Sequence, residues 1–288
     1  MPLLRGRDIQ RFANEWEQLE DEKWLINTHN GLKDSGVHPI KVRENFPVLW
    51  KRLATYSDAL ERRLDKGDHW SNLRNCAYLG DFSKPKIIYP NMTKYLPFYL
   101  DTAEHFIIND KAFILTSEAE SLSYLTAALN STVFRCCFMD NFPNLGEDRR
   151  ELRKIFMDKI PVKKPTPAQA SLFEALVPMV QAAKSEFQRL GDTPLQNAAS
   201  FLEEVIDACV MEVYFADHMT EKKLSLIEHV TPLLDGFNAS ASKGDQAQAA
   251  LRFYELANDS KHPVRNILIR IPVDSPDLLA VIQKEGAV

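Results

Sequence analysis

The chain has 288 residues, of which 45% are hydrophobic and 26% are charged, as in an ordinary globular protein. No apolar run approaches the ~20 residues that a membrane-spanning helix needs, and the first residues lack the apolar core of a secretory signal. The net charge of −5 argues against a simple, uniformly basic nucleic-acid binder. The four cysteines form no C-x-x-C pair, so we expect reduced thiols and a cytoplasmic location.

The acidic residues are concentrated in the second part of the chain. Residues 1–163 carry 24 Lys and Arg against 23 Asp and Glu, whereas residues 164–288 carry 11 against 17. The excess of basic residues is largest within residues 41–95, which hold 11 basic and 6 acidic side chains. Because the local field decides where a polyanion binds, we expect any nucleic-acid site to lie in the N-terminal part.

The first hundred residues predict both strands and a helix. Residues 24–28 are typical of a short buried strand, and residues 44–67 predict one helix because leucines recur at spacings of three and four. The central stretch is 80–100. Within it, the β-branched and aromatic run 86–89, closed by Pro90, predicts a strand.

The next segments lead to a change in composition. Residues 105–109 and 112–115 are apolar runs separated by two polar residues, which predicts a hairpin. Helices are predicted over residues 121–138 and 149–158. The run 160–165 contains two prolines and two lysines and resists regular structure. We therefore expect a first domain over residues 1–163 and a second over residues 164–288.

The second domain is predicted to be mainly helical. The exception is residues 267–271, where Ile alternates with Leu and Arg as in a strand. Ser275 and Pro276 are typical of a helix start. Helices are predicted over residues 167–190, 195–216, 220–234 and 245–257. The expected fold class is therefore α+β: a mixed-sheet domain followed by a mainly helical C-terminal extension.

The usual catalytic motifs are absent from the sequence. It has no G-x-G, no P-loop, no H-E-x-x-H and no G-x-S-x-G. Acidic-x-Lys triplets at Asp21/Lys23 and Glu221/Lys223 are of the kind that nucleases use, but such triplets are frequent on charged helix faces. We expect a binding module without catalytic residues, metal or cofactor of its own.

Five loose motifs occur in one order along the chain. They are Leu4-Arg5-Gly6-Arg7-Asp8-Ile9, the segment 56–67 with Leu60-Glu61-Arg62-Arg63 followed by Trp70, the run 82–90, the run 124–131, and Ile160-Pro161-Val162 before a long helix. In this order they resemble the TaqI-like C-terminal specificity domain. This is the target-recognition domain of type IIG restriction–modification enzymes and related adenine-specific DNA methyltransferases. The resemblance covers about residues 3–190, and residues 201–234 resemble the helical tail of such enzymes.

The resemblance implies a domain that holds double-stranded DNA against a separate methyltransferase domain and reads the target sequence. That upstream domain, with any nuclease part, would belong to the same polypeptide. It would flip the adenine and use AdoMet, and we expect AdoMet and Mg only in those parts. The methyltransferase domain normally carries an Asn-Pro-Pro-aromatic motif, and this chain has no Asn-Pro dipeptide. Because the chain starts just before the first motif, we expect it to be part of a longer protein.

Basic, amide and aromatic side chains are the candidates for DNA contact, because they bind phosphates and base edges. In the central stretch we expect Lys84, Lys86 and Lys94 at phosphates, and Asn91 and Tyr95 at base edges. Each also has a structural interpretation as a solvated lysine, a turn asparagine or a packing tyrosine. Further candidates come from the same strand, from the entry segment, from a loop and from a helix: Tyr89, Arg5, Arg7, Arg11, Lys41, Arg43, Arg62, Arg63 and Lys66.

Two other interpretations remain open at this point. The acidic helical half is compatible with a protein-interaction module, and Glu221 with Lys223 is compatible with a stand-alone nuclease. Asn130 and Ser131 are expected to cap a helix and position a neighbouring loop.

Overall fold

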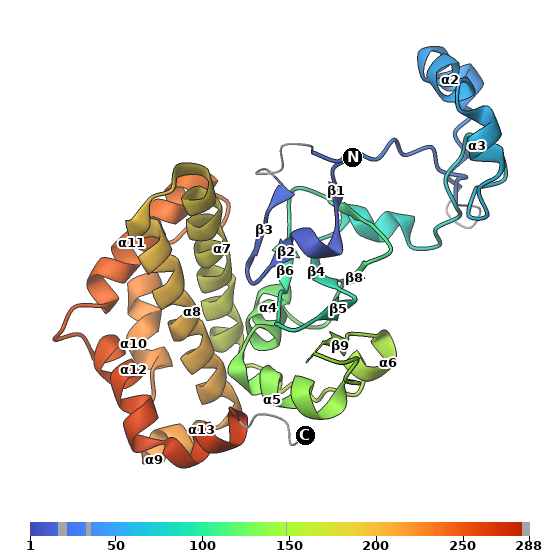
Figure 1. Cartoon of the computed structure of the whole chain (residues 1–288). Coiled ribbons are helices and arrows are strands. Elements are labelled where there is room, and N and C mark those ends of the chain that lie inside the picture. The colour runs from blue at the N-terminus through green and yellow to red at the C-terminus, as the bar shows by residue number, and fades with distance from the viewer. Residues whose placement is uncertain (17–21, 33–35, 148, 284–288) are drawn as a thin grey trace. The chain divides into compact units, whose positions relative to one another are not determined.

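The computed structural model describes the chain except for residues 17–21, 33–35, 148 and 284–288 (Figure 1). The described chain forms two compact units. Unit 1 comprises residues 1–3, 23–85 and 102–107, and unit 2 comprises residues 4–22, 86–101 and 108–288. The boundary predicted at residue 163 lies inside unit 2, and the division into functional domains there stays a prediction.

Within its described residues, unit 1 contains three short helices and one 3-10 turn. These are α1 (Val42–Asn45), α2 (Pro47–Ala54), α3 (Ser57–Glu61) and η4 (Leu79–Ser83). The single helix predicted over residues 44–67 is wrong. Pro47 has no N–H to donate, so the chain leaves helical geometry at Phe46 and starts again with Pro47 at the first helical position. No side chain of α2 or α3 is buried.

Side chains that bind the backbone hold the loops of unit 1 together. The Thr28 hydroxyl donates to Ser71 O at 2.9 Å, and the Asn72 amide donates to Ile40 O at 2.9 Å. The buried strand predicted over residues 24–28 is wrong. Trp24 is 60% exposed, and its pairing with Pro2 is an isolated bridge rather than part of a strand ladder.

The main sheet of unit 2 has three antiparallel strands. They are β6 (Tyr99–Asp101), β4 (Lys86–Pro90) and β8 (Ala112–Leu115), in that order. The strand predicted at residues 86–89 is confirmed as β4, which is buried along its whole length. The hairpin predicted between residues 105–109 and 112–115 is wrong, because β8 pairs instead with the apolar central strand β4.

Two further small antiparallel ladders lie in the described part of unit 2. One joins β2 (Ile9–Gln10) to β3 (Ala13–Asn14), and the other joins β5 (Met92–Thr93) to β9 (Arg150–Glu151). The helix predicted over residues 149–158 is correct only at its end, α6 (Lys154–Met157). The remaining short elements are β1 (Leu3–Leu4), η1 (Gly6–Asp8) and β7 (Ile107–Ile108).

The helix predicted over residues 121–138 is divided into α4 (Leu122–Leu129) and α5 (Thr132–Asn141). Two side chains cause the division. Ser131 Oγ accepts from Phe134 N at 3.2 Å and so caps α5. Asn130 donates to Phe98 O at 2.8 Å and accepts from Phe98 N at 3.1 Å. The predicted roles of Asn130 and Ser131 in capping and in loop positioning are therefore confirmed.

Long helices form the rest of unit 2, and α7 (Pro167–Leu190), α8 (Thr193–Tyr214) and α11 (Lys243–Ala257) run side by side (Figure 1). As predicted, α7 ends at Gly191, whose φ of 69° is left-handed. The apolar core is continuous from β4 through α4 into these helices. The shorter elements are α9 (Ala216–Glu221), α10 (Ile227–Val230), η5 (Thr231–Leu234), α12 (Pro263–Asp274) and α13 (Pro276–Ile282).

The strand predicted over residues 267–271 is wrong, because this segment lies in α12. Ile267 and Ile271 are four residues apart and share the buried face of the helix, whereas Ile269 is 58% exposed. The start predicted at Ser275 is confirmed as that of α13. Its hydroxyl contacts His218 Nε2 at 2.8 Å.

The α+β class with a helical C-terminal half is confirmed. Within the described residues, no helix is both long and apolar enough to cross a membrane.

Candidate nucleic-acid interface

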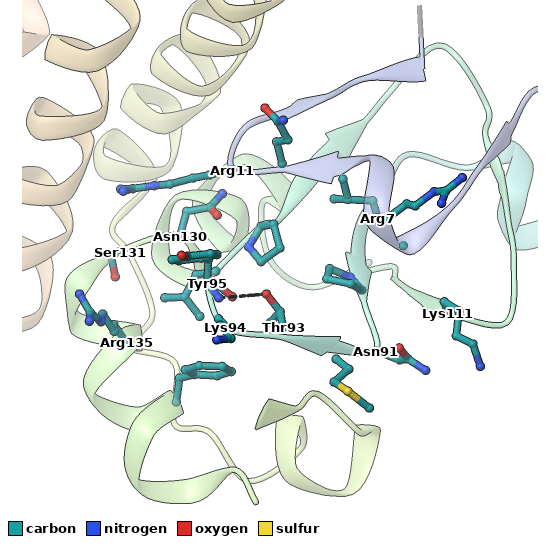
Figure 2. A pocket seen from close by; sticks show the side chains of 18 of the residues that line it. Arg7, Arg11, Asn91, Thr93, Lys94, Tyr95, Lys111, Asn130, Ser131 and Arg135 are labelled. Atoms are coloured by element: carbon teal, nitrogen blue, oxygen red, sulfur yellow. Dashed lines mark hydrogen bonds between the residues drawn. The ribbon is translucent and has the colours of Figure 1, made fainter. Parts of the chain in front are cut away.

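Unit 2 contains a basic hollow of about 1190 Å³ (Figure 2). Among the described residues that line this basic hollow, five are Lys or Arg and none is Asp or Glu. A concave surface lined by charges of one sign concentrates field lines, so a basic hollow attracts polyanions even when the whole chain is anionic. The five cations are Arg7, Arg11, Lys94, Lys111 and Arg135.

Segments far apart in the sequence contribute to this lining. Arg7 lies in η1 and Arg11 in the turn between β2 and β3, whereas Lys94 follows β5 (Figure 2). Arg135 lies on the first turns of α5, and Lys111 lies in the turn before β8. Arg7, Lys94, Lys111 and Arg135 are exposed. Within the described part of the chain, neither Lys94 nor Arg135 has an ion-pair partner, so both charges are available to a ligand.

The segment that carries Lys94 and Tyr95 is held at both ends. Thr93 Oγ1 accepts from Tyr95 N at 3.0 Å and donates to Tyr95 O at 2.8 Å (Figure 2). At the other end, Asn130 binds both backbone groups of Phe98. Lys94 and Tyr95 project between these two anchors, and 79% of Tyr95 is exposed.

Residues of α7 and α8 hold the turn that contains Arg11. Arg11 Nε lies 3.2 Å from Glu203 Oε2, and Lys184 Nζ donates to Arg11 O at 2.8 Å. Lys184 also pairs with Glu203. One carboxylate is thus shared by two cations, and the charge that Arg11 adds to the basic hollow is partly balanced.

The start of α5 is fixed by a carboxylate of α8. Asp207 accepts from Thr132 N at 2.7 Å and from Thr132 Oγ1 at 2.8 Å. Burial raises the pKa of Asp207, and the hydrogen bonds from Thr132 and the charge of Arg11 oppose that rise. Asp207 thereby orients the helix that presents Arg135 to the basic hollow.

Two residues predicted to contact DNA are buried. Lys86 and Asp101 are both 0% exposed, and Lys86 Nζ lies 2.6 Å from Asp101 Oδ2. Tyr89 is also buried, and this burial raises its pKa to about 12. The predictions for Lys86 and Tyr89 are wrong, because β4 is the central strand of its sheet and is covered on both faces.

Other predicted residues in unit 2 have distinct environments. Arg5 is largely buried and pairs with Asp8, its Nε lying 2.7 Å from Asp8 Oδ2, and it does not line the basic hollow. Asn91 and Tyr95 both line it, together with Arg7, Arg11 and Lys94. The structure therefore brings together five of the predicted residues.

The remaining candidates belong to unit 1. Arg63 donates to Trp70 O at 3.0 Å and to Asn72 O at 3.2 Å, so its guanidinium holds a loop. The side chains of Lys41, Arg43, Arg62, Lys66 and Lys84 are exposed. Of these, Lys41 Nζ lies 3.3 Å from Glu44, and Lys84 Nζ lies 2.9 Å from Asp81. Contact between these unit 1 residues and DNA stays a prediction.

Lys111 and Arg135 were not predicted as DNA-contacting residues. Lys111 lies beside Asp110 in a segment interpreted as a hairpin turn, and Arg135 lies in a helix interpreted from its apolar face. The positive charge was the one signal in the sequence for either residue. Their place in the basic hollow depends on chain packing.

The acidic-x-Lys pair of α9 is exposed. Glu221 ends α9, and Lys223 follows with a φ of 55°. Asp21 of the other triplet lies outside the described residues. Among the residues that are described, no group of three His, Cys, Asp or Glu side chains is placed to hold a metal ion.

Residues 1–162 match the family model of the TaqI-like C-terminal specificity domain. The match covers more than half of the chain, and the chain therefore belongs to this family. Members of the family are DNA-specificity domains of restriction–modification enzymes rather than catalytic domains. No curated protein sequence matches the chain. All five cations of the basic hollow lie within the matched residues.

Proposed function

We propose that this chain recognises a specific sequence in double-stranded DNA, and that the basic hollow of unit 2 faces the duplex. The observation that carries the proposal is the lining of that hollow, where five cations and no carboxylate come together within the family match. DNA carries one negative charge per ~1.7 Å of helix axis, so a surface of this charge and shape is complementary to it.

The lining residues divide by chemistry into two kinds of contact. Arg7, Lys94, Lys111 and Arg135 would bind phosphates and set the register of the protein on the duplex. Asn91 presents an amide that can pair with a base edge, as Asn pairs with adenine. Because phosphate contacts carry no sequence information, specificity would depend on Asn91, on Tyr95 and on unit 1.

We further propose that the parent protein is a type IIG restriction–modification enzyme with an adenine methyltransferase domain upstream. That domain, with any nuclease part, would use AdoMet and Mg, and this chain would act in the cytoplasm without catalysis of its own. The helices after residue 163 would serve as a spacer or as a docking surface for those parts. The family membership supports this proposal.

Selection from a random duplex library tests the proposed function. The full chain is incubated at low salt, and bound duplexes are sequenced over several rounds. We expect one short motif to be enriched, and a duplex with that motif to bind at least 100-fold more tightly than a scrambled duplex, as specific sites generally do. Selection that enriches no motif, or a chain that binds no duplex at low salt, would contradict the proposal.

A further inference from the structure

Tyr95 is the most exposed aromatic side chain of the basic hollow. Its relative exposure is 79%, and Figure 2 shows it among the side chains that line the hollow. An aromatic ring left in water gives up the free energy that burial would provide. The neighbours of Tyr95 follow the opposite pattern, because Leu96, Phe98 and Tyr99 are all buried.

This exposure is combined with a fixed backbone. The two hydrogen bonds between Thr93 and Tyr95 close a turn, and Phe98 is held by the Asn130 amide. A side chain on an ordered backbone loses less conformational freedom when it binds. The turn therefore presents the Tyr95 ring ready for contact with a flat apolar surface.

The surroundings of Tyr95 indicate which flat surface this is. Lys94 precedes it and Arg135 lies in the same lining, and both are cations without an ion-pair partner in the described chain. A nucleotide joins a phosphate to a flat base. The Tyr95 ring can stack on the base, and the nearby free cations can bind the phosphate, as in proteins that bind single strands by stacking.

We propose that Tyr95 stacks on the face of a DNA base, while Lys94 binds a neighbouring phosphate. In an intact duplex each base face is covered by the adjacent base pairs, so this contact requires local unstacking at the bound site. The inference rests on the proposed function and adds to it: the chain would distort its target as well as read it.

Four substitutions separate stacking from charge and from hydrogen bonding. With the selected duplex, Tyr95→Ala lowers affinity roughly tenfold, and the slope of log affinity against log salt is unchanged. Tyr95→Phe binds within about twofold of the wild type, because stacking needs the ring and not the hydroxyl. Lys94→Ala reduces the steepness of the slope by about 0.9. The control Leu256→Ala removes an exposed apolar side chain of α11, outside the lining, and leaves binding unchanged.

A fluorescent base reports the distortion directly. The duplex carries 2-aminopurine at successive positions of the site, whose fluorescence rises when the base loses its stacked neighbours. We expect a rise at one or two positions with the wild type and none with Tyr95→Ala. Thermal unfolding of each variant shows that it is folded.

The outcomes distinguish this inference from the proposed function. A wild type that binds its motif without any change in fluorescence, or a Tyr95→Ala variant with unchanged affinity, overturns the stacking alone. Equal losses for Tyr95→Phe and Tyr95→Ala would show that the hydroxyl makes the contact, which also overturns it. A chain that binds no duplex removes both proposals.

Discussion

Lys86 and Asp101 face each other across β4 and β6, with Nζ and Oδ2 2.6 Å apart and neither side chain exposed. The attraction between two buried charges offsets the loss of their hydration only while both are present. A lysine that looks like a DNA contact in the sequence is therefore a structural residue of the sheet.

Removing one charge of this pair should lower the free energy of unfolding far more than removing both. We expect Lys86→Met or Asp101→Leu to lower the free energy of unfolding by about 3–5 kcal/mol, because each removes the opposite charge that faces the remaining buried one. The double variant should recover most of that loss. Urea unfolding of the four proteins measures the coupling, and strictly additive losses would contradict a direct pair.

Asp207 should contribute more to the free energy of unfolding as pH falls. Its pKa is raised by burial, so the folded chain binds a proton more readily than the unfolded chain does. This contribution is complete below the ordinary Asp pKa and is lost as pH rises through the raised value.

The variant Asp207→Asn isolates that term. Its amide oxygen still accepts from Thr132, and it has no charge to titrate. We expect the melting temperature of the wild type to rise relative to Asp207→Asn between pH 7 and pH 4. A difference that stays constant, or one that changes in the opposite direction, would show that the carboxylate is not destabilised by burial.

Glu203 should weaken DNA binding through Arg11. Its carboxylate pairs with Arg11, a cation of the basic hollow, and also with Lys184. We expect Glu203→Gln to bind DNA about fivefold more tightly and with a steeper salt dependence, because one guanidinium gains freedom to bind a phosphate.

Glu204→Gln is the matched control for that variant. Glu204 is the adjacent residue of α8, it is exposed, and its substitution changes the net charge equally. Equal affinities for Glu203→Gln and Glu204→Gln would attribute the effect to total charge. Weaker binding by Glu203→Gln would show that the carboxylate holds Arg11 in its binding position.

Asn130 should be required for stability because it satisfies two buried backbone groups. Asn130→Ala leaves the buried N–H of Phe98 without this partner, whereas Phe98 O still accepts from Phe12 N at 3.1 Å. We expect a loss of at least about 2 kcal/mol in the free energy of unfolding, which urea unfolding measures. Asn91→Ala is the comparison at a half-buried residue of the same hollow, whose amide makes one long hydrogen bond of 3.5 Å to Asp110 O, and a similar loss there would contradict the assignment.

Local patterns were sufficient for several elements and for the fold class. The β-branched run that forms β4, the capping residue Ser131 and the left-handed Gly191 all act through their immediate neighbours. The alternating isoleucines of α12 were misleading because spacings of two and four are both present, and only packing chooses between them.

The candidate site was predictable in part. Arg7, Lys94 and Tyr95 are exposed residues of loops and turns, where charge and aromaticity are good guides. The prediction that Lys86 contacts DNA is wrong because strand pairing, which the local sequence does not show, places Asp101 opposite it. Arg135 was not predicted because α5 reaches the basic hollow through the break at Asn130, which sets the direction of the second helix.

The salt dependence of DNA binding tests the central claim most directly. The wild type is compared with Arg7→Ala/Lys94→Ala/Arg135→Ala, and with the control Lys164→Ala/Arg252→Ala/Lys261→Ala. The control removes three exposed cations outside the lining. If the basic hollow binds DNA, the first triple variant should lower the steepness of log affinity against log salt by about 2.7, and the control should leave it unchanged. Equal slopes for the two triple variants would contradict the account.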